Sequence, residues 1–543
     1  PHPSRATNAV LRVRSPLRNM ADSTRGRGRV AIVGGGPSGL VAAKEALAAG
    51  LRPTVLEKSS SAGGLWRAAD GKVWQSLRTN LSKHTCAFSD FPWPSTADDF
   101  PHAEDVADYL ERYARTFGLH ACIELGARVT LVQRASFGRG YCVRWVTQGG
   151  TEQAETFEFA IIAAGVFSAP HVPAELHGFQ NQVVHASQYR DSSDFAGRRC
   201  LVLGAAFSGA DAAASIARVA ESVTLVASGT APLYYLPRLV DGRPIDLALY
   251  SRAARDAAKR LSEAEACASR HAALARLGGR LEGLPSPRTD RKPRVAITDE
   301  LSRAVSAGLL SVQTARVRAC ERGWVTFEDG RRAEFDVILA ATGYRTAVNF
   351  LAPALSEAVE YDADDWLQPL IAHECVWPAA PNLAFVGMYR GPYFGVLELQ
   401  ARWACGVFAG RLPMPSAGEL ADGLARERAI RQMDPRPQFP HDYPTMADDL
   451  ARHVGALPVT ILQDSAHPLH ALLYHGPLLP FHYRLQGRQA NPRLAEAAIR
   501  ECERSYPHLV ANDAAGRGRA AGRAADGTDP EEAKAENTSQ AAC

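Results

Sequence analysis

Three glycines placed just after an apolar run are the residues of this chain whose type and spacing most clearly predict a chemistry. The stretch RVAIVGGGPSGLVAAKEALAAG, residues 29–50, places Gly34, Gly36 and Gly39 between a predicted buried strand and a predicted alanine-rich helix. In such a turn the first glycine allows a sharp bend, the second lets the backbone approach a pyrophosphate, and the third lets the helix pack on the strand. Because the helix N-terminus then faces the anion, we expect a dinucleotide-binding site.

Glu57 supports the same prediction, because it ends the next apolar strand, RPTVLEK. It follows the turn by roughly 20 residues, where a carboxylate can accept hydrogen bonds from ribose hydroxyls. A GxGxxG pattern alone predicts little, since glycine-rich loops are common. Strand, turn, helix, second strand and terminal acid together favour a nucleotide site over a purely structural loop.

A second glycine-rich turn lies in RRCLVLGAAFSGADAAASIARVA, residues 198–220. Gly204 and Gly209 hold the first and third positions, but Ala206 stands at the position of close approach, where a methyl group would press on a phosphate. We therefore expect a second nucleotide site in an altered form.

The strand after this second turn bears on which nicotinamide cofactor is bound. In SVTLVASGT, Ala227 and Ser228 stand where Glu57 stands in the first unit, so no carboxylate repels a ribose 2'-phosphate. This favours NADPH over NADH. No arginine directly follows Ser228, so the positive partner of the 2'-phosphate must come from elsewhere, and Arg238 is the candidate. We expect the preference for NADPH to be weaker for that reason.

The two units and the strands that follow them predict an α/β fold with two nucleotide-binding Rossmann-like domains. Apolar strands return after the second unit in FDVILAATGY and PNLAFVGMY, so the second domain is predicted to be inserted into the first, which is discontinuous. The predicted segments are an extension at 1–28, the first domain at 29–175 and 335–511, the inserted domain at 176–334, and a disordered tail at 512–543.

Size and composition narrow the class of protein. A chain of 543 residues predicts two or three domains, and a formal charge of +3 without a basic face gives no reason to expect a nucleic-acid partner. The ten cysteines form no CxxC pair, which argues against a disulfide framework, a zinc ribbon and a dithiol redox centre. No apolar run has the length of a membrane span. We expect no metal site, no transmembrane segment and a cytoplasmic location, or an organelle if the arginine-rich extension is a transit peptide.

Several stretches jointly resemble the flavin-containing monooxygenases, from about Arg29 to Ile499. They are GGGPSG, GGLW, SLRTNLSKHTCAFSDFPWP, FQNQVVHASQYR, LVLGAAFSGAD, ATGY at 341–344 and PNLAFVGMYRGPYFGVLELQARW. The family's fingerprint FxGxxxHxxx followed by an aromatic residue is matched by Phe179, His185 and Tyr189, while Asn181 replaces the glycine.

This resemblance implies FAD at the first unit and NADPH at the second. It also implies reduction of the flavin by hydride transfer, addition of dioxygen to give a C4a-hydroperoxyflavin, and oxygenation of a soft nitrogen or sulfur atom of a small molecule. Asn80 is implied beside the reactive flavin edge, as the catalytic residue. The implied FAD neighbours are Gly34, Gly36, Gly39, Glu57, Gly64, Leu65, Trp66, Thr79, Thr342 and Gln400, and the implied NADP neighbours are Gly204, Ser208 and Gly209.

Alternatives stay open at several positions and for the function itself. His185 is expected to be structural, Asp90 and Glu398 to cap helices or lie on the surface, and the histidines 467, 470 and 475 to lie on the surface. A pyridine-nucleotide disulfide reductase would need a cysteine pair that is absent. An NADPH oxidase and a degenerate, non-catalytic flavoprotein both remain compatible with the sequence.

Overall fold

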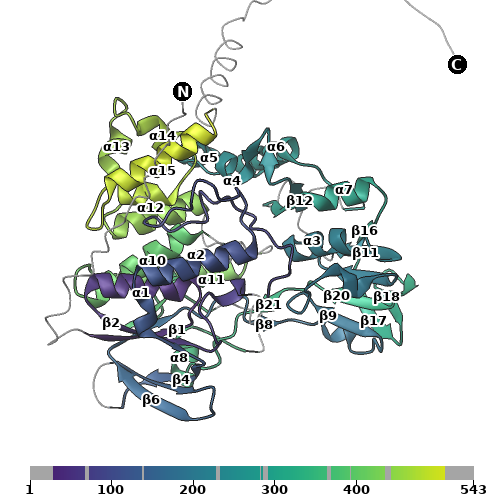
Figure 1. The fold of residues 1–543 in the computed structure, drawn as a ribbon, viewed down its shortest axis with the longest axis horizontal. Coiled ribbons are helices and arrows are strands. Elements are labelled where there is room, and N and C mark those ends of the chain that lie inside the picture. The colour runs from purple at the N-terminus through teal and green to yellow at the C-terminus, as the bar shows by residue number, and fades with distance from the viewer. Residues whose placement is uncertain are drawn as a thin grey trace, which may run out of the picture.

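The computed structural model of the chain describes residues 28–67, 72–136, 140–227, 233–281, 283–284, 292–363, 369–389, 391, 393–433 and 442–507. The predictions for the extension before residue 28, for Ser228 and for the tail 512–543 lie outside these residues. Two α/β units lie side by side in Figure 1, the first at the left and the second, coloured teal, at the right.

The first unit is built on a parallel five-stranded sheet with the order β22-β7-β1-β2-β3. Its strands are β1 (Arg29–Val33), β2 (Arg52–Glu57), β3 (Ile123–Leu125), β7 (Phe159–Ile162) and β22 (Leu383–Phe385). Helix α1 (Pro37–Ala49) connects β1 to β2, and α10 (Phe394–Phe408) packs on α1, where Cys405 Sγ lies 3.7 Å from the carbonyl oxygen of Ala42. The sheet is buried on both faces, which is why its central strands read as continuous apolar runs.

The second unit repeats this plan in a parallel sheet with the order β16-β11-β10-β20-β9. Its strands are β9 (Gln182–His185), β10 (Arg199–Leu203), β11 (Ser222–Ala227), β16 (Ser311–Thr314) and β20 (Val337–Ala340), and α3 (Phe207–Ile216) connects β10 to β11. Each unit also carries a three-stranded antiparallel sheet directly before the strand that rejoins the centre. These are β4 (Arg128–Arg134), β5 (Tyr141–Val146) and β6 (Glu152–Phe157), and β17 (Val317–Glu321), β18 (Trp324–Phe327) and β19 (Arg332–Glu334).

The first unit is discontinuous, as predicted, because β22 pairs with β7 after the whole second unit has intervened. The predicted boundary at residue 335 is wrong, however. Strand β20, in the stretch FDVILAATGY, pairs with β10 and β9 of the second sheet instead of returning to the first. A short apolar run predicts a buried strand, but it carries no information on which sheet the strand joins. The two connections between the units pair as β8 (Ala169–Pro170) and β21 (Tyr344–Arg345).

The remaining elements cover the sheets and connect the two units. They are α2 (Ala103–Thr116), β12 (Leu233–Leu236), β13 (Leu239–Val240), β14 (Arg243–Pro244), α4 (Ile245–Leu249), α5 (Arg252–Ala258), α6 (Glu263–Leu277), β15 (Arg294–Ile297), α7 (Glu300–Ser306), α8 (Pro353–Ala358), α9 (Ala372–Cys375), α11 (Ala417–Arg431), α12 (Tyr443–His453), α13 (Val459–Gln463), α14 (His470–Tyr474), α15 (Pro492–Ser505) and the short 3-10 helices η2 (Gly64–Trp66), η3 (Leu119–Cys122), η4 (Ala174–Leu176), η5 (Ser192–Phe195) and η6 (Pro480–Arg484).

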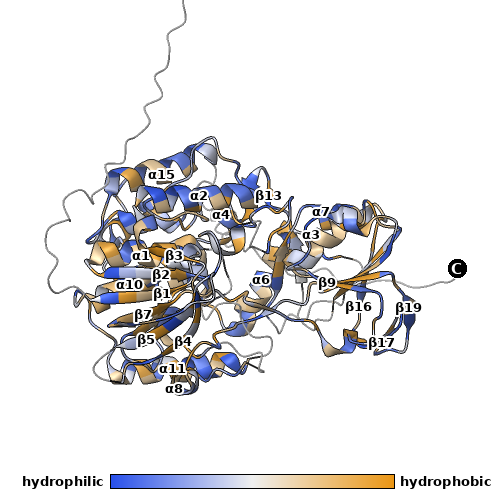
Figure 2. Cartoon of the chain, turned by 60° about the horizontal axis from the view of Figure 1, so that its bottom comes forward, coloured by the Kyte–Doolittle hydropathy of each residue, from blue (hydrophilic) through white to orange (hydrophobic). Residues whose placement is uncertain are grey.

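Apolar residues concentrate in the strands, while outer helices such as α2 and α15 show polar surfaces (Figure 2). Within the described residues, every helix is too short or too polar to cross a bilayer.

Candidate functional site

The first glycine-rich turn has the close contacts that its sequence predicts. Gly34 has a φ of +107°, and a Cβ atom there would lie 2.6 Å from the carbonyl oxygen of Ala163 on the neighbouring strand connection. A Cβ atom at Gly39 would lie 1.8 Å from the carbonyl oxygen of Gly34. Both positions therefore exclude any side chain, and α1 starts in direct contact with the end of β1.

Gly36 has a different role, because its backbone conformation (φ −74°, ψ −172°) is one that any residue can adopt. It is the N-cap of α1, which has no side-chain cap and no acidic residue in its first turn. A helix N-terminus with these properties attracts an anion through its amide groups and dipole. A Cβ atom at Gly36 would meet the backbone of Gly64 at 3.6 Å, so the glycine leaves space beside this N-terminus.

The GGLW turn packs directly on the first glycine-rich turn. The amide of Gly63 donates to the carbonyl oxygen of Gly35 at 2.9 Å, and a Cβ atom on Gly64 would lie 2.9 Å from Gly36 Cα. Leu65 and Trp66 follow in η2, both half-buried. The predicted neighbours Gly36, Gly64, Leu65 and Trp66 are thus brought together around one N-terminus.

Glu57 lies at the same turn and is 5% exposed. Its Oε2 accepts a hydrogen bond from the amide of Gly35 at 2.5 Å, and its Oε1 accepts one from the amide of Ser59 at 2.8 Å. These two bonds fix the carboxylate at the end of β2, and each oxygen can still accept from a ribose hydroxyl.

The second turn has nearly the same geometry as the first. Gly204 has a φ of +100°, and a Cβ atom there would lie 2.4 Å from the carbonyl oxygen of Ala341, while a Cβ atom at Gly209 would lie 1.7 Å from the carbonyl oxygen of Gly204. Ala206 is the N-cap of α3 with φ −80° and ψ −171°, which matches Gly36 closely. Its methyl group therefore costs no backbone strain and occupies the position that Gly36 leaves open. Ser208 is half-buried in the first turn of α3, which also lacks a side-chain cap and an acid.

Arg238 does not have the free charge that the sequence-based prediction required. It is 8% exposed, and its guanidinium contacts Asp299 at 3.0 Å and Asp211 at 3.5 Å. Its Nε donates to the carbonyl oxygen of Thr79 at 3.0 Å, and its Nη2 donates to Asn80 Oδ1 at 3.2 Å. Two carboxylates already balance the charge of Arg238, which faces the Thr79–Asn80 step, so its contact with a 2'-phosphate stays a prediction.

Thr79 and Asn80 lie in the loop after η2, where Thr79 is buried and Asn80 half-buried. The Oγ1 atom of Thr79 is buried without a hydrogen-bond partner among the described residues. Buried hydroxyls are normally satisfied, so an orphaned one fits a contact with a bound cofactor. This orphaned hydroxyl, the space at Gly36 and the uncapped helix together fit FAD.

The side chains of Gln400 and Thr342 form hydrogen bonds with the protein backbone. Gln400 is fully buried; its Oε1 accepts from the amide of Gly387 at 2.8 Å, and its Nε2 donates to the carbonyl oxygen of Glu374 at 2.5 Å. A Cβ atom at Gly387 would lie 2.0 Å from Ser38 Oγ, so Gln400 fixes a backbone segment against the start of α1. Thr342 Oγ1 donates to the carbonyl oxygen of His171.

His185 fits the structural alternative. Its Nδ1 lies 2.9 Å from Ser187 Oγ and its Nε2 lies 3.0 Å from the carbonyl oxygen of Gly343, and burial lowers its pKa. The histidines 467, 470 and 475, predicted to lie on the surface, are half-buried.

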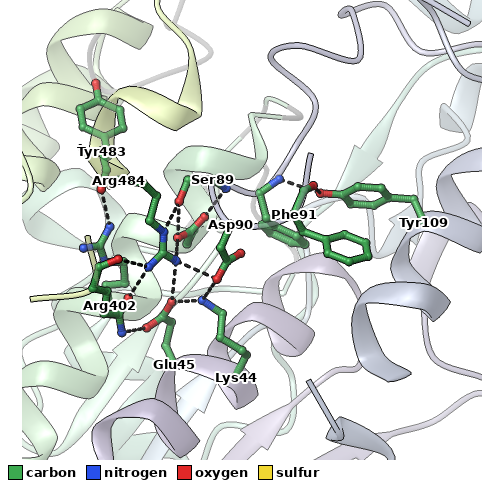
Figure 3. A network of polar contacts seen from close by, with 12 residues as sticks. Lys44, Glu45, Ser89, Asp90, Phe91, Tyr109, Arg402, Tyr483 and Arg484 are labelled. Atoms are coloured by element: carbon green, nitrogen blue, oxygen red, sulfur yellow. Dashed lines mark hydrogen bonds and ion pairs between the residues drawn. The ribbon is translucent and has the colours of Figure 1, made fainter. Parts of the chain in front are cut away.

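A buried charge cluster, which the sequence did not predict, lies where α1, α10 and η6 meet (Figure 3). We define it by Lys44, Glu45, Asp90, Glu398, Arg402 and Arg484. Asp90 and Glu398, expected as caps or surface residues, both pair with Arg484 here. Oxygen atoms of Glu45, Asp90 and Glu398 lie within 4.8 Å of one another, a spacing that could hold a metal ion, but the Arg484 guanidinium contacts all three carboxylates. No sequence signal could have located this cluster, because it joins four segments that are distant in the chain.

A comparison with protein families identifies the chain. The sequence model of the family described as "Flavin-binding monooxygenase-like" matches residues 27–515. The chain belongs to this family. The resemblance seen in the sequence is thereby confirmed. The protein is a flavin-dependent monooxygenase, and it has the two-domain FAD/NADP fold of such enzymes.

Individual proteins agree with this membership. Flavin-containing monooxygenase 5 of Cavia porcellus is 30% identical over 484 residues, covering 84% of this chain and 89% of that protein. Dimethylaniline monooxygenase (N-oxide-forming) 4 of Rattus norvegicus is 28% identical over 485 residues, covering 84% of each. Among solved structures, S-allyl-L-cysteine S-oxygenase from Allium sativum has a TM-score of 0.59 at 20% identity and covers 91% of this chain and 99% of that chain. An open crystal structure of cyclohexanone monooxygenase has a TM-score of 0.57 at 17% identity and covers 79% and 97%. These two structures show the fold alone.

Proposed function

We propose that this flavin-dependent monooxygenase uses NADPH and dioxygen to oxygenate a soft nitrogen or sulfur atom of a small molecule. The observation that carries the proposal is the pair of glycine-rich turns with matching backbones, each starting an uncapped helix. The first turn, with Glu57, would hold FAD, and the second would hold NADPH. The names of two relatives, an N-oxide-forming dimethylaniline monooxygenase and an S-oxygenase of S-allyl-L-cysteine, support a nucleophilic nitrogen or sulfur as the acceptor.

Bound FAD would supply the redox and oxygen chemistry, so the protein needs to bind, orient and protect it from water. The residues that would hold its pyrophosphate and ribose are Gly36 and Glu57. Thr79 and Asn80 would lie at its reactive edge. We infer that Asn80 donates a hydrogen bond from its amide NH2 to an oxygen atom there, because an amide adds no negative charge beside an electron-rich group, whereas a carboxylate would repel it.

A direct test measures the products that the purified protein forms with its flavin bound, a state recognised by its yellow colour. We expect NADPH oxidation that consumes dioxygen and forms the N-oxide of dimethylaniline or the sulfoxide of a thioether probe. An NADPH oxidase would convert the same dioxygen into hydrogen peroxide without product. A non-catalytic flavoprotein would bind FAD without oxidising NADPH. Either of these results would contradict the proposal.

Variants of Asn80 test its role separately. In Asn80→Ala and Asn80→Asp, we expect flavin reduction by NADPH to persist, since cofactor binding depends on other residues. The fraction of dioxygen that appears as hydrogen peroxide should rise at the expense of product. A wild-type product yield in both variants would exclude the donor role, and loss of FAD would indicate that Asn80 serves only to shape the loop.

A further inference from the structure

One segment of the second unit reaches across to the loop that carries Asn80. It comprises residues 233–249, from β12 to α4, and its attachment to the second unit is the pairing of β12 with β15. Tyr235 in β12 donates to the carbonyl oxygen of Ala205 in the second glycine-rich turn at 2.8 Å. Helix α4 lies between the two units in Figure 1. The segment therefore contacts one glycine-rich turn directly and the Asn80 loop at its other end.

Arg238 makes the first contact with that loop. Its backbone amide donates to Asp299 Oδ1 at 2.8 Å, and its Nη1 lies 3.0 Å from Asp299 Oδ2, so the second unit holds this residue by both its backbone and its side chain. Asp211, two residues after Gly209 on α3, lies 3.5 Å from Nη2. From this anchored position the guanidinium donates to the carbonyl oxygen of Thr79 and to Asn80 Oδ1.

The contact with Arg238 decides which way the Asn80 amide faces. An arginine has hydrogen-bond donors and no acceptor, so the atom of Asn80 that it contacts must be the oxygen. The NH2 group is consequently turned away from Arg238. Among the described residues, no acceptor is recorded for this NH2 group. The amide is thus oriented as a donor toward whatever binds beside the loop.

Asp246 makes the second contact with this loop, at Ser82 and Thr85, further along the chain from Asn80. Its Oδ2 accepts from the amide of Ser82 at 3.1 Å, from Ser82 Oγ at 2.8 Å and from Thr85 Oγ1 at 2.5 Å. Asp246 and Thr85 are each 1% exposed, and Ser82 is 0% exposed. Three hydrogen bonds to one buried carboxylate oxygen hold the backbone directly after Asn80 in a single arrangement.

We propose that Arg238 and Asp246 are positioning residues of the monooxygenase reaction. Arg238 contacts Asn80 directly, Asp246 holds the loop at Ser82 and Thr85, and together they direct the Asn80 NH2 group toward the flavin. This proposal rests on the proposed function and deepens it. In this proposal, the segment 233–249 of the second unit fixes the orientation of Asn80, which belongs to the first unit. Neither side chain needs to touch FAD or the substrate.

The test compares Arg238→Lys with Arg238→Met in the flavin-loaded protein. Lysine keeps the charge beside Asp211 and Asp299 but lacks the planar fork needed to reach Thr79 and Asn80 together. Two quantities are measured: amide hydrogen exchange over residues 77–86, and hydrogen peroxide released per NADPH oxidised. Both variants should exchange faster in this loop. The peroxide yield should rise by roughly tenfold, the lower end of what one hydrogen bond to a charged group contributes.

Matched variants separate positioning from general damage. Arg252→Lys removes an arginine that is even more deeply buried, 1% exposed and paired with Asp448 at 2.7 Å, and should leave both measurements at the wild-type level. Asp246→Asn keeps an oxygen that can accept from Ser82 and Thr85, so it should stay close to the wild type. Asp246→Leu should resemble Arg238→Met.

A combined variant gives the decisive result. If Arg238 acts through Asn80, then Arg238→Lys adds no peroxide in an Asn80→Ala background. An additive increase, or unchanged exchange over residues 77–86 in Arg238→Lys, would overturn the proposal. A wild-type protein that forms no oxygenated product would contradict the proposed function instead, and the exchange measurements would still decide whether Arg238 and Asp246 hold the loop.

Discussion

Replacing Arg484 by methionine should destabilise the protein strongly, because this side chain connects η6 to the first unit at the buried charge cluster. Its Nη2 contacts Glu398, lies 2.9 Å from Asp90 and 3.7 Å from Glu45, and its Nε donates to Ser89 Oγ at 2.7 Å. The Arg484 side chain is 5% exposed. Methionine preserves much of the aliphatic volume and removes the charge and all of these hydrogen bonds.

The expected loss of unfolding free energy is about 3–5 kcal/mol, the usual cost of removing one partner from a buried ion pair. The cluster holds three carboxylates and three cations, so the variant keeps three carboxylates with only Lys44 and Arg402 as cations. Lys44 lies 2.7 Å from Asp90, whereas Arg402 donates to the carbonyl oxygen of Tyr483 at 3.1 Å (Figure 3). The remaining cations therefore do not replace the contact of Arg484 with Glu398.

The loss of unfolding free energy in Arg484→Met should also depend on pH. Burial by itself would raise the pKa of Glu45 and Asp90, but Lys44 and Arg484 lower both pKa values below their usual range. A lowered pKa contributes stability above the carboxyl's unfolded-state pKa, and that contribution is lost as the pH falls through the folded-state pKa. Without Arg484 these carboxyls bind protons more readily, so the difference between wild type and variant should be largest at neutral pH and smaller at about pH 4.

Urea denaturation followed by circular dichroism measures this difference, with Arg428→Met as the control. Arg428 pairs with Glu360 at 2.7 Å, but the two side chains are 51% and 40% exposed. An exposed pair contributes about 0–1 kcal/mol, so the control should lie close to the wild type. If Arg484→Met also costs less than about 1 kcal/mol, or if its cost grows as the pH falls, the reasoning is refuted.

Three further substitutions test the two glycine-rich turns. Gly36→Val should fold, since a Cβ atom there meets only the Gly64 backbone at 3.6 Å, but it should lose FAD because the side chain fills the space for the pyrophosphate; a stoichiometric flavin spectrum would contradict this. Ala206→Gly should lower the Kd for NADPH about threefold in a binding titration by removing the methyl group at the N-cap of α3, and an unchanged Kd would show that the methyl does not touch the phosphate. Gly209→Ala should cost about 1–3 kcal/mol in urea denaturation, because its Cβ atom would lie 1.7 Å from the Gly204 carbonyl oxygen; wild-type stability would show that α3 can shift freely.

The sequence predicted local geometry well, because a glycine-rich turn depends on neighbours in the chain. The bend at Gly34, the contact of Gly39 with it and the carboxylate at Glu57 all follow from one strand-turn-helix-strand segment, and the structure has each of them. The duplication of this segment, and so the two-unit fold, could be read from the second set of glycines. Ala206, which the sequence placed at the position of close approach, is the N-cap of the second helix.

Contacts between distant segments were decided only by the tertiary structure. Strand β20 joins the second sheet, Arg238 contacts Asn80, and Asp90 and Glu398 meet through Arg484. An apolar run or a single charged residue shows that a partner is needed without identifying it. The partner is selected when the sheets and helices pack, since only then does burial remove water and make one pairing of charges much more favourable than the others.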